Sequence, residues 1–416
     1  MIHFLFPFSD FVWILQQEEY DSGRYLGWMK RFFFRRGFLK TGKLVYTLRA
    51  QLTLGVAKLL FILKLVGWYV LFGFKIAIIL VPLALVFIPL FVLVAHLLLL
   101  PFILYAHAQV RTRASTLVKR HTGLKIIGIA GSYGKTSTKN FVYDLVRHRY
   151  KTQMIEGNIN TLTGISQWIL HTLAPETELL VMEMDAYKPG EIKATCAITP
   201  PDIAVLTTVG EQHMERFRST QRLYATLGEI RLCLKPGGVF IADKKSIEAI
   251  GALDSPVDTS TLTYENEPVT AIGLSESNKE NLARALKVAE VLTVPRNYIV
   301  DACTHLTIAD RRQKPGYVLG YEGIDDSYNI TLSTASAGLK TARALANAKG
   351  KKLLVLSAGI TELGPDQKEG NVQLGEAFVQ YAHQAVVLKT MFARDIEKGI
   401  DSKIPLQFYP RLEDFI

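Results

Sequence analysis

Apolar residues dominate the first quarter of the chain and give way, near Thr122, to short apolar runs separated by helical patterns. From Ile76 through Val110 there are 35 consecutive residues without Asp, Glu, Lys or Arg, and the stretch from Leu52 to Lys75 is nearly as apolar. A helix that crosses a bilayer needs roughly 20 apolar residues. We therefore predict two membrane-spanning helices, with a break between Gly67 and Lys75 and with kinks or boundaries at Pro82, Pro89 and Pro101.

Two other interpretations fit the apolar segment. One is a single tilted span followed by an interfacial helix. The other is a buried helix pair in a soluble protein, which is disfavoured because such helices seldom run this long without a polar face.

Charge is distributed very unevenly. The chain has 48 Lys+Arg and 38 Asp+Glu, a net charge of +10, yet no acidic residue lies between Ser22 and Tyr143, where 18 of the basic residues are found. Because positively charged residues stay on the cytoplasmic side of a membrane, a hairpin with both ends in the cytoplasm is predicted. The basic residues that flank the apolar segment are Arg24, Lys30, Arg31, Arg35, Arg36, Lys40, Lys43 and Arg49 before it, and Arg111, Arg113, Lys119, Arg120 and Lys125 after it.

The segment RFFFRRGF, Arg31 to Phe38, alternates cations with aromatic rings. Binders of single-stranded nucleic acid use the same pattern. Beside a membrane span, contact with anionic membrane lipid is the simpler explanation, and no nucleic-acid partner is predicted. The first residues lack the basic start of a signal peptide and include Asp10, so cleavage is not expected.

The remainder of the chain has the pattern of an α/β protein. Runs such as KIIGIAG, ELLVMEM, DIAVLTTVG, GGVFIAD and KKLLVLSAG alternate with helical patterns, as in a mostly parallel sheet with crossover helices. The three cysteines, Cys196, Cys233 and Cys303, are far apart and form no C-x-x-C pair. Neither a disulfide framework nor a zinc site is therefore predicted, and a reducing cytosol fits best.

A phosphate-binding loop follows the first of these runs. The strand Lys125 to Ala130 passes directly into GSYGKTSTKNFVYDLV, and strand, glycine loop and helix are the context that such a loop requires. Gly131 and Gly134 let backbone N–H groups point at phosphate oxygens. Lys135 supplies positive charge, and the Thr136 hydroxyl can bind Mg²⁺. The strict phosphate-loop pattern G-x-x-x-x-G-K-[ST] is not met, because Ile129 stands at the position of its first glycine. The alternative to a phosphate-binding loop is a chance glycine turn that caps a helix.

Six further segments resemble the ATP-dependent Mur ligases, in the order found in that family. They are GNINTLTG from Gly157, in which only Asn160 of the family's asparagine pair remains, VMEMDAYKPGEI from Val181, PDIAVLTTVGEQHMERF from Pro201, SNKENLARAL from Ser277, GIDDSYN from Gly323 and LVLSAGITELG from Leu354. The resemblance covers roughly residues 122 to 416. It is greatest to the branch that adds D-alanyl-D-alanine to UDP-N-acetylmuramoyl-tripeptide.

The resemblance implies a P-loop-type central domain, a smaller α/β C-terminal domain and a set of site residues. It implies catalytic roles for Lys135, Glu183 and His213, and Mg²⁺ ligation by Thr136, Glu183 and His213. It implies ATP binding by Gly131, Ser132, Tyr133, Gly134, Lys135, Thr136, Ser137, Asn278, Arg311 and Asp326. From the residues alone, Glu183 also fits a helix cap or an ion pair, His213 a packed or solvated side chain, and Asp326 a turn.

The sequence departs from the family in four places. Leu227, in TLGEI, stands where the family has a lysine that becomes carbamylated and binds a second Mg²⁺. Tyr187 and Lys188 stand where its acidic motif commonly has Asn and His. The apolar, basic region takes the place of the domain that binds the UDP-sugar. The chain also ends at Ile416, before the family's last strand and helix, so either the sequence is truncated or its C-terminal domain is abbreviated.

We expect residues 1–50 to form a basic, aromatic interfacial segment, 51–110 the membrane helices, 111–304 the ATP-binding central domain and 305–416 the C-terminal domain. The predicted protein is an ATP-dependent amide ligase of the bacterial inner membrane with its catalytic domain in the cytoplasm. Its expected partners are a UDP-linked or lipid-linked peptidoglycan precursor, an amino acid or dipeptide amine, and a protein that supplies a sugar site. The alternatives are an amidating or non-catalytic ATP-binding subunit and the ATPase component of a membrane complex.

Overall fold

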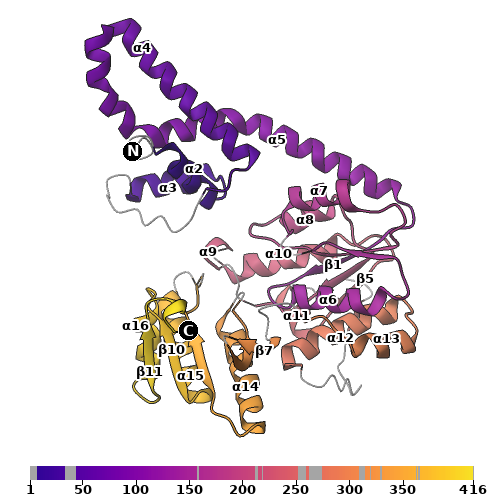
Figure 1. Ribbon diagram of the computed structural model, residues 1–416. Coiled ribbons are helices and arrows are strands. Elements are labelled where there is room, and N and C mark those ends of the chain that lie inside the picture. The colour runs from indigo at the N-terminus through magenta and orange to yellow at the C-terminus, as the bar shows by residue number, and fades with distance from the viewer. Residues whose placement is uncertain are drawn as a thin grey trace. The chain divides into compact units, whose positions relative to one another are not determined.

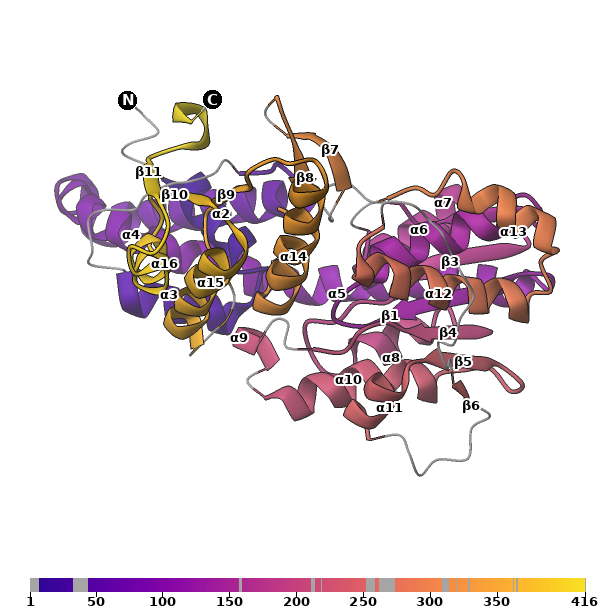
Figure 2. The same cartoon turned by 90° about the horizontal axis from the view of Figure 1, so that it is seen from below.

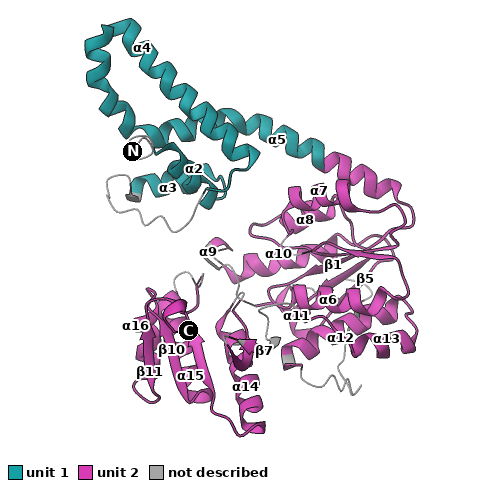
Figure 3. Cartoon of the chain, in the orientation of Figure 1, with its two compact units in different colours: residues 1–110 teal, residues 111–416 magenta. Residues whose placement is uncertain are grey.

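A computed structural model describes the chain except for residues 1–6, 33–43, 157–158, 211–213, 218, 252–258, 262–273, 309–313, 319, 328–329, 362, 364–365 and 416. The chain divides into two compact units, residues 1–110 and 111–416 (Figure 3).

The first unit is helical. It comprises α2 (Phe8–Gln17), α3 (Ser22–Phe32), α4 (Leu48–Val86) and the start of α5 (Ile88–Arg120) (Figure 1). By length and composition, α4 and α5 are each able to cross a bilayer. Within the predicted break, between Gly67 and Lys75, the backbone of α4 leaves helical geometry at Gly73 with φ 75° and ψ 171°, while the two candidate spans themselves are separated at Phe87. Pro82 and Pro101 lie inside the two long helices.

The helices α2 and α3 pack against the two long helices, which the sequence did not predict. Phe8 and Tyr25 are buried in a shared apolar cluster with Phe61 and Ile88, and the rings of Phe8 and Phe61 meet edge to face at 5.5 Å. The Tyr25 hydroxyl donates to the Pro89 carbonyl at 3.2 Å. Most of the segment Arg31 to Phe38 lies outside the described residues.

The second unit is built on a parallel sheet with strand order β2-β3-β1-β4-β5-β6. This confirms the predicted α/β class. Figure 2 labels β3, β1, β4, β5 and β6 of this sheet. The strands are β1 (Lys125–Ala130), β2 (Thr152–Met154), β3 (Leu179–Glu183), β4 (Ile203–Leu206), β5 (Val239–Ala242) and β6 (Thr259–Thr261). The helices are α6 (Lys135–Val146), α7 (Leu162–Thr172), α8 (Glu191–Cys196), α9 (Met214–Phe217), α10 (Thr220–Leu232), α11 (Lys244–Ala249), α12 (Glu276–Val291) and α13 (Arg296–Cys303).

The strands of this sheet are apolar on both faces because helices cover both. Ile127 and Ile129 of β1 pack with α6, α12 and α13. Ile126 and Ala130, one position removed, pack on the other face with α7, α8 and α10 and with the end of α5. Side chains alternate between the two faces of a strand, so a strand that is covered on both faces is apolar at successive positions. Polar side chains are therefore concentrated where the strands end.

The C-terminal part of this unit contains a second, smaller parallel sheet of order β11-β10-β9 and an antiparallel pair, β7 with β8. Ile360, Phe378, Val387 and Ile396 belong to its apolar core. The smaller α/β part predicted from the sequence is thereby confirmed, while the boundary at residue 304 stays a prediction. Its elements are β7 (Lys314–Val318), β8 (Tyr321–Asp325), α14 (Leu332–Ala348), β9 (Leu354–Ser357), α15 (Gln367–Tyr381), β10 (Gln384–Leu388), α16 (Ala393–Ile400), β11 (Leu406–Tyr409) and the 3₁₀ turn η2 (Leu412–Asp414).

Candidate nucleotide-binding site

The glycine loop connects the carboxyl end of β1 to the start of α6, as the sequence predicted. Gly131 has φ 140° and Gly134 has φ 86°, a region that favours glycine. A Cβ atom would lie 2.1 Å from Thr207 Oγ1 at the first position and 2.2 Å from Asn281 Oδ1 at the second. Both positions therefore need glycine for backbone conformation and for space.

The amino end of α6 has the features of an anion site. Its N-cap is Gly134, and no side chain of the described residues caps its first turn. In contrast, the Glu229 carboxylate accepts hydrogen bonds from the N–H groups of Gly190 at 2.7 Å and Lys193 at 3.0 Å, and so caps α8. First-turn N–H groups without a cap, at the positive end of a helix dipole, are suited to phosphate oxygens.

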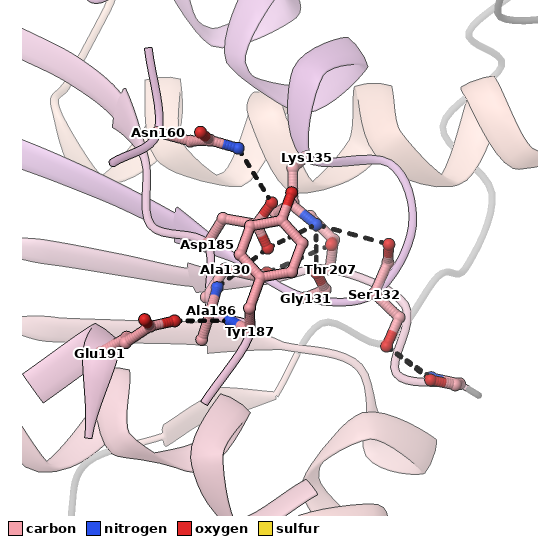
Figure 4. Close-up of polar contacts among 11 residues, drawn as sticks. Ala130, Gly131, Ser132, Lys135, Asn160, Asp185, Ala186, Tyr187, Glu191 and Thr207 are labelled. Carbon is pink, nitrogen blue, oxygen red and sulfur yellow. Dashed lines mark hydrogen bonds and ion pairs between the residues drawn. The ribbon is translucent and has the colours of Figure 1, made fainter. Parts of the chain in front are cut away.

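The Lys135 side chain lies folded into the loop (Figure 4). Its Nζ donates to the carbonyls of Gly131 at 2.6 Å and Ser132 at 3.4 Å. The same atom lies 3.4 Å from Asp185 Oδ1, and the other carboxylate oxygen of Asp185 accepts from Asn160 Nδ2 at 3.3 Å. Lys135 and Asp185 are both largely buried. A carboxylate thus stands beside the lysine that is expected to bind phosphate.

A second buried ion pair lies next to the first. Lys139 Nζ is 2.9 Å from Glu183 Oε1 and donates to the Ile155 carbonyl at 2.9 Å. The Lys139 side chain is 2 % exposed and that of Glu183 is 12 % exposed. No residue that the structure describes donates a well-aligned hydrogen bond to this buried Glu183 oxygen. The Lys139 charge therefore balances that of Glu183.

The helix α12 forms the other side of the loop through Asn281 and Arg284. Arg284, which is 4 % exposed, donates from Nη2 to Asp243 Oδ2 at 2.6 Å and from Nη1 to Asn281 Oδ1 at 3.4 Å. Burial alone would raise the pKa of Asp243. Hydrogen bonds from Arg284 and Ser246, with the Arg284 charge, outweigh that effect and lower the pKa below its usual value. Asp243 is therefore ionised near neutral pH and holds Arg284 in place.

The structure brings the predicted loop residues Gly131 to Ser137 and Glu183 together at the carboxyl ends of β1 and β3. Asn278 is buried near the start of α12, where its N–H donates to Ser275 Oγ at 3.3 Å. Asp326 follows β8 in the C-terminal part. His213 and Arg311 lie outside the described residues. The roles assigned to these residues stay predictions.

Sequence reasoning missed Asp185, Asn281 and Arg284. Asp185 lies two residues beyond Glu183, on the same face of an extended segment, which was a usable signal. Asn281 and Arg284 follow Asn278 by one and two helical turns, a spacing that could have placed them on one face of α12. Of Asn278, Asn281 and Arg284, only the tertiary structure shows that Asn281 is the residue beside Gly134.

Leu227 lies in the hydrophobic core, where it is 3 % exposed. It belongs to the cluster that includes Leu223, Ile230 and Met184. An ammonium or carbamate at this position would have to displace apolar neighbours, and an unpaired buried charge costs several kcal/mol. The leucine at this position, in place of the family's lysine, therefore fits an apolar site in the folded protein. A second metal cannot be held at this position.

The described residues fit a nucleotide with Mg²⁺. The loop provides glycines whose space a Cβ would fill and an uncapped helix start for phosphates. Mg²⁺ prefers oxygen ligands such as carboxylates and hydroxyls, and Glu183 and Thr136 supply these types at neighbouring element ends. Within the described part of the chain, no group of three His, Cys, Asp or Glu residues forms a metal site by itself. Phosphate oxygens and water would complete the ligand set.

Comparison with known proteins agrees with this geometry. Residues 129–293 match the model of the Mur ligase middle domain. The chain is 27 % identical over 292 residues to the UDP-N-acetylmuramoyl-tripeptide–D-alanyl-D-alanine ligase of Escherichia coli, covering 62 % of this chain and 63 % of that protein. It is 34 % identical over 119 residues to the enzyme of the same name from Bacillus subtilis, covering 29 % of this chain and 26 % of that protein. The chain thus spans less than two thirds of these relatives.

Solved structures show the same fold. MurF from Thermotoga maritima, in complex with ADP, has a TM-score of 0.62 and 22 % identity and covers 74 % of this chain and 76 % of that one. MurF from Acinetobacter baumannii has a TM-score of 0.61 and 21 % identity, covering 73 % and 71 %. Residues 129–293 therefore match the Mur ligase middle domain, and the chain shares the fold of the solved MurF structures.

Proposed function

We propose that this protein is a membrane-anchored ligase of Mur type that couples ATP hydrolysis to amide-bond formation on a peptidoglycan precursor. The observation that carries the proposal is the glycine loop at the end of β1, with Lys135 within it and Glu183 at the end of the neighbouring strand. In open α/β sheets, ligands bind outside the carboxyl ends of the strands. The Mur ligase middle domain, residues 129–293, supports the same assignment.

The proposed reaction phosphorylates a substrate carboxylate with ATP, and an amine then attacks the acyl phosphate to release phosphate. Lys135 and the uncapped N–H groups of α6 hold the phosphate oxygens and offset negative charge as the phosphoryl group moves. Thr136 and Glu183 would hold Mg²⁺, which would supply further positive charge. Catalysis of this kind is positioning and electrostatics, so the chain needs no side-chain nucleophile.

The proposed substrates follow from the relatives, whose names state UDP-N-acetylmuramoyl-tripeptide and D-alanyl-D-alanine. The helical unit of residues 1–110 precedes the middle domain, which favours a lipid-linked or membrane-proximal acceptor beside the UDP-linked one. A partner protein that supplies a sugar site belongs to the same proposal.

The ligase proposal is tested with purified full-length protein, ATP and Mg²⁺. The acceptor is UDP-muramoyl-tripeptide or its lipid-linked form, and the amine is D-alanyl-D-alanine. We expect ADP release only when acceptor and amine are both present, together with a product whose mass equals that of the joined substrates minus water. ADP release that is indifferent to the amine contradicts the ligase proposal and favours an ATPase.

We also propose that α4 and α5 anchor the protein in the bacterial inner membrane, with the catalytic part in the cytoplasm. Large apolar side chains on both helices are exposed, among them Val70, Leu71, Ile79, Phe102 and Tyr105. Exposure of so many large apolar groups is costly in water and favourable in lipid. We expect the full chain in the membrane fraction after cell lysis and after washing with alkaline carbonate. Recovery in the soluble fraction contradicts anchoring.

One observation favours a second candidate function. Leu227 stands where the Mur ligases have a carbamylated lysine, and it is buried in the apolar core. Mur-like enzymes that amidate a precursor also lack that lysine, and they work with a glutaminase partner. Glutamine-dependent amidation by a copurifying complex, in place of dipeptide addition, is the outcome that selects this candidate.

A further inference from the structure

Two buried ion pairs connect α6 to the end of β3. The distance between the two lysines along the helix matches the distance between the two carboxylates along the strand. Lys135 and Lys139 are four residues apart on one face of the helix, and they pair with Asp185 and Glu183, two residues apart along the strand direction. Four helical residues rise about 6 Å, and two strand residues advance about 6.6 Å. The two pairs therefore form together without distorting either element.

The pair closer to the glycine loop sets a condition on phosphate binding. A lysine ammonium has three N–H donors, and Lys135 directs its donors to two loop carbonyls and to Asp185. A phosphate that binds Lys135 must replace one of these contacts, and the two longest, both 3.4 Å, are those to Ser132 and Asp185. The Asp185 charge also repels phosphate at short range, where the buried surroundings screen it weakly.

Asn160 holds Asp185 in this position. Its Nδ2 donates to Asp185 Oδ2 at 3.3 Å, while the Ala186 N–H donates to Asp185 Oδ1 at 3.0 Å. The side chain of Asp185 is 13 % exposed. A buried carboxylate with fixed partners cannot swing into solvent at little cost when a phosphate arrives, so its charge must be offset by a cation.

We propose that Asp185 makes nucleotide binding depend on divalent cation. Without Mg²⁺ its carboxylate competes with phosphate for Lys135 and repels it. With Mg²⁺ the cation that accompanies the phosphates offsets the Asp185 charge as Lys135 turns to the phosphate. This inference rests on the proposed ATP site and assigns Asp185 a positioning role, exerted through Lys135 and the cation.

The test measures the affinity of the full-length protein for ADP by calorimetry, with Mg²⁺ in excess and with EDTA. For Asp185→Asn and Asp185→Ala, we expect ADP without Mg²⁺ to bind about ten-fold or more tightly than to the wild type, because a buried repulsive charge has been removed. The affinity ratio with and without Mg²⁺ should fall by the same factor. Asp185→Glu, which keeps the charge, should preserve the wild-type ratio.

Asp202→Asn is the matched control. Asp202 also pairs with a lysine, Lys235, at 2.8 Å, but lies at the amino end of β4, at the opposite edge of the sheet from the loop. Its variant should show the wild-type ratio. An unchanged ratio in folded Asp185→Asn and Asp185→Ala overturns the inference. Should neither variant fold, the wild type decides, since an ADP affinity that does not respond to Mg²⁺ also overturns it.

The inference and the proposed function fail differently. If the wild type binds no ADP or ATP at millimolar Mg²⁺, the proposed function is contradicted and the inference with it. If the wild type binds nucleotide while the variants keep its Mg²⁺ dependence, only the inference is contradicted.

Discussion

Lys135→Ala is expected to lower the rate of nucleotide turnover about a thousand-fold. Removal of one group that stabilises transition-state charge typically costs 10²- to 10³-fold in rate, and the Lys135 ammonium is the charge placed within the glycine loop. Its side chain contacts loop carbonyls and Asp185 and belongs to no apolar cluster. Alanine therefore leaves the core intact but leaves the Asp185 carboxylate without its cation, which costs about 3–5 kcal/mol in stability, so turnover is compared in protein shown to be folded by circular dichroism. The measurement is substrate-dependent ADP release.

Lys125→Ala provides the matched control for this experiment. Lys125 begins β1, at the end of the strand opposite to the loop, and its side chain is exposed. Its replacement should leave turnover within about two-fold of the wild type, because an exposed charge more than a Debye length from the reacting phosphate is screened. Undiminished turnover in Lys135→Ala would show that the phosphate-loop assignment is wrong.

Lys139→Ala is expected to destabilise the parallel sheet by about 3 kcal/mol. The substitution leaves the Glu183 carboxylate buried without its cation, and breaking one partner of a buried pair typically costs about 3–5 kcal/mol. It also removes the donor to the Ile155 carbonyl. Hydrogen exchange of the backbone amides of β1 and β3 reports the free energy of opening in this part of the chain.

A second substitution separates the charge effect from lost packing. Adding Glu183→Gln to Lys139→Ala removes the stranded carboxylate charge, so the double variant should recover most of the lost protection. Lys244→Ala is the control, because its contact with Glu248 is an exposed pair at 4.0 Å, and such pairs contribute less than about 1 kcal/mol. Full protection in Lys139→Ala would mean that the Lys139–Glu183 pair does not stabilise the sheet.

Much of the candidate site could be predicted because its signals are local. The strand Lys125 to Ala130, the glycines of the loop and the helix that follows are adjacent in the sequence. The two turns of the loop need glycine, because Gly131 and Gly134 both have positive φ values. The two long apolar helices were equally local, since length and composition decide them. The break was predicted only as the range Gly67 to Lys75, and the structure places a kink at Gly73.

The partners of the charged residues could not be predicted in the same way. Lys135 and Asp185 are 50 residues apart, and Arg284 and Asp243 are 41 apart. The Lys135–Asp185 contact depends on β3 lying beside β1 and on the register that places Ile129 opposite Glu183. The Arg284–Asp243 contact depends on α12 lying beside the end of β5. Strand order and register result from packing of the entire sheet, which no short pattern encodes.

Leu227 illustrates the same division. The sequence by itself determined that this position cannot hold a metal, because leucine has no ligand atom. Only the tertiary structure decided that the position belongs to the apolar core between α10 and the sheet. By itself the sequence determined the parallel α/β class, the glycine loop between strand and helix, and the two long apolar helices, since these depend on periodicity and neighbouring residues. The tertiary structure decided which cation faces which carboxylate, because distant segments meet only when the sheet is assembled.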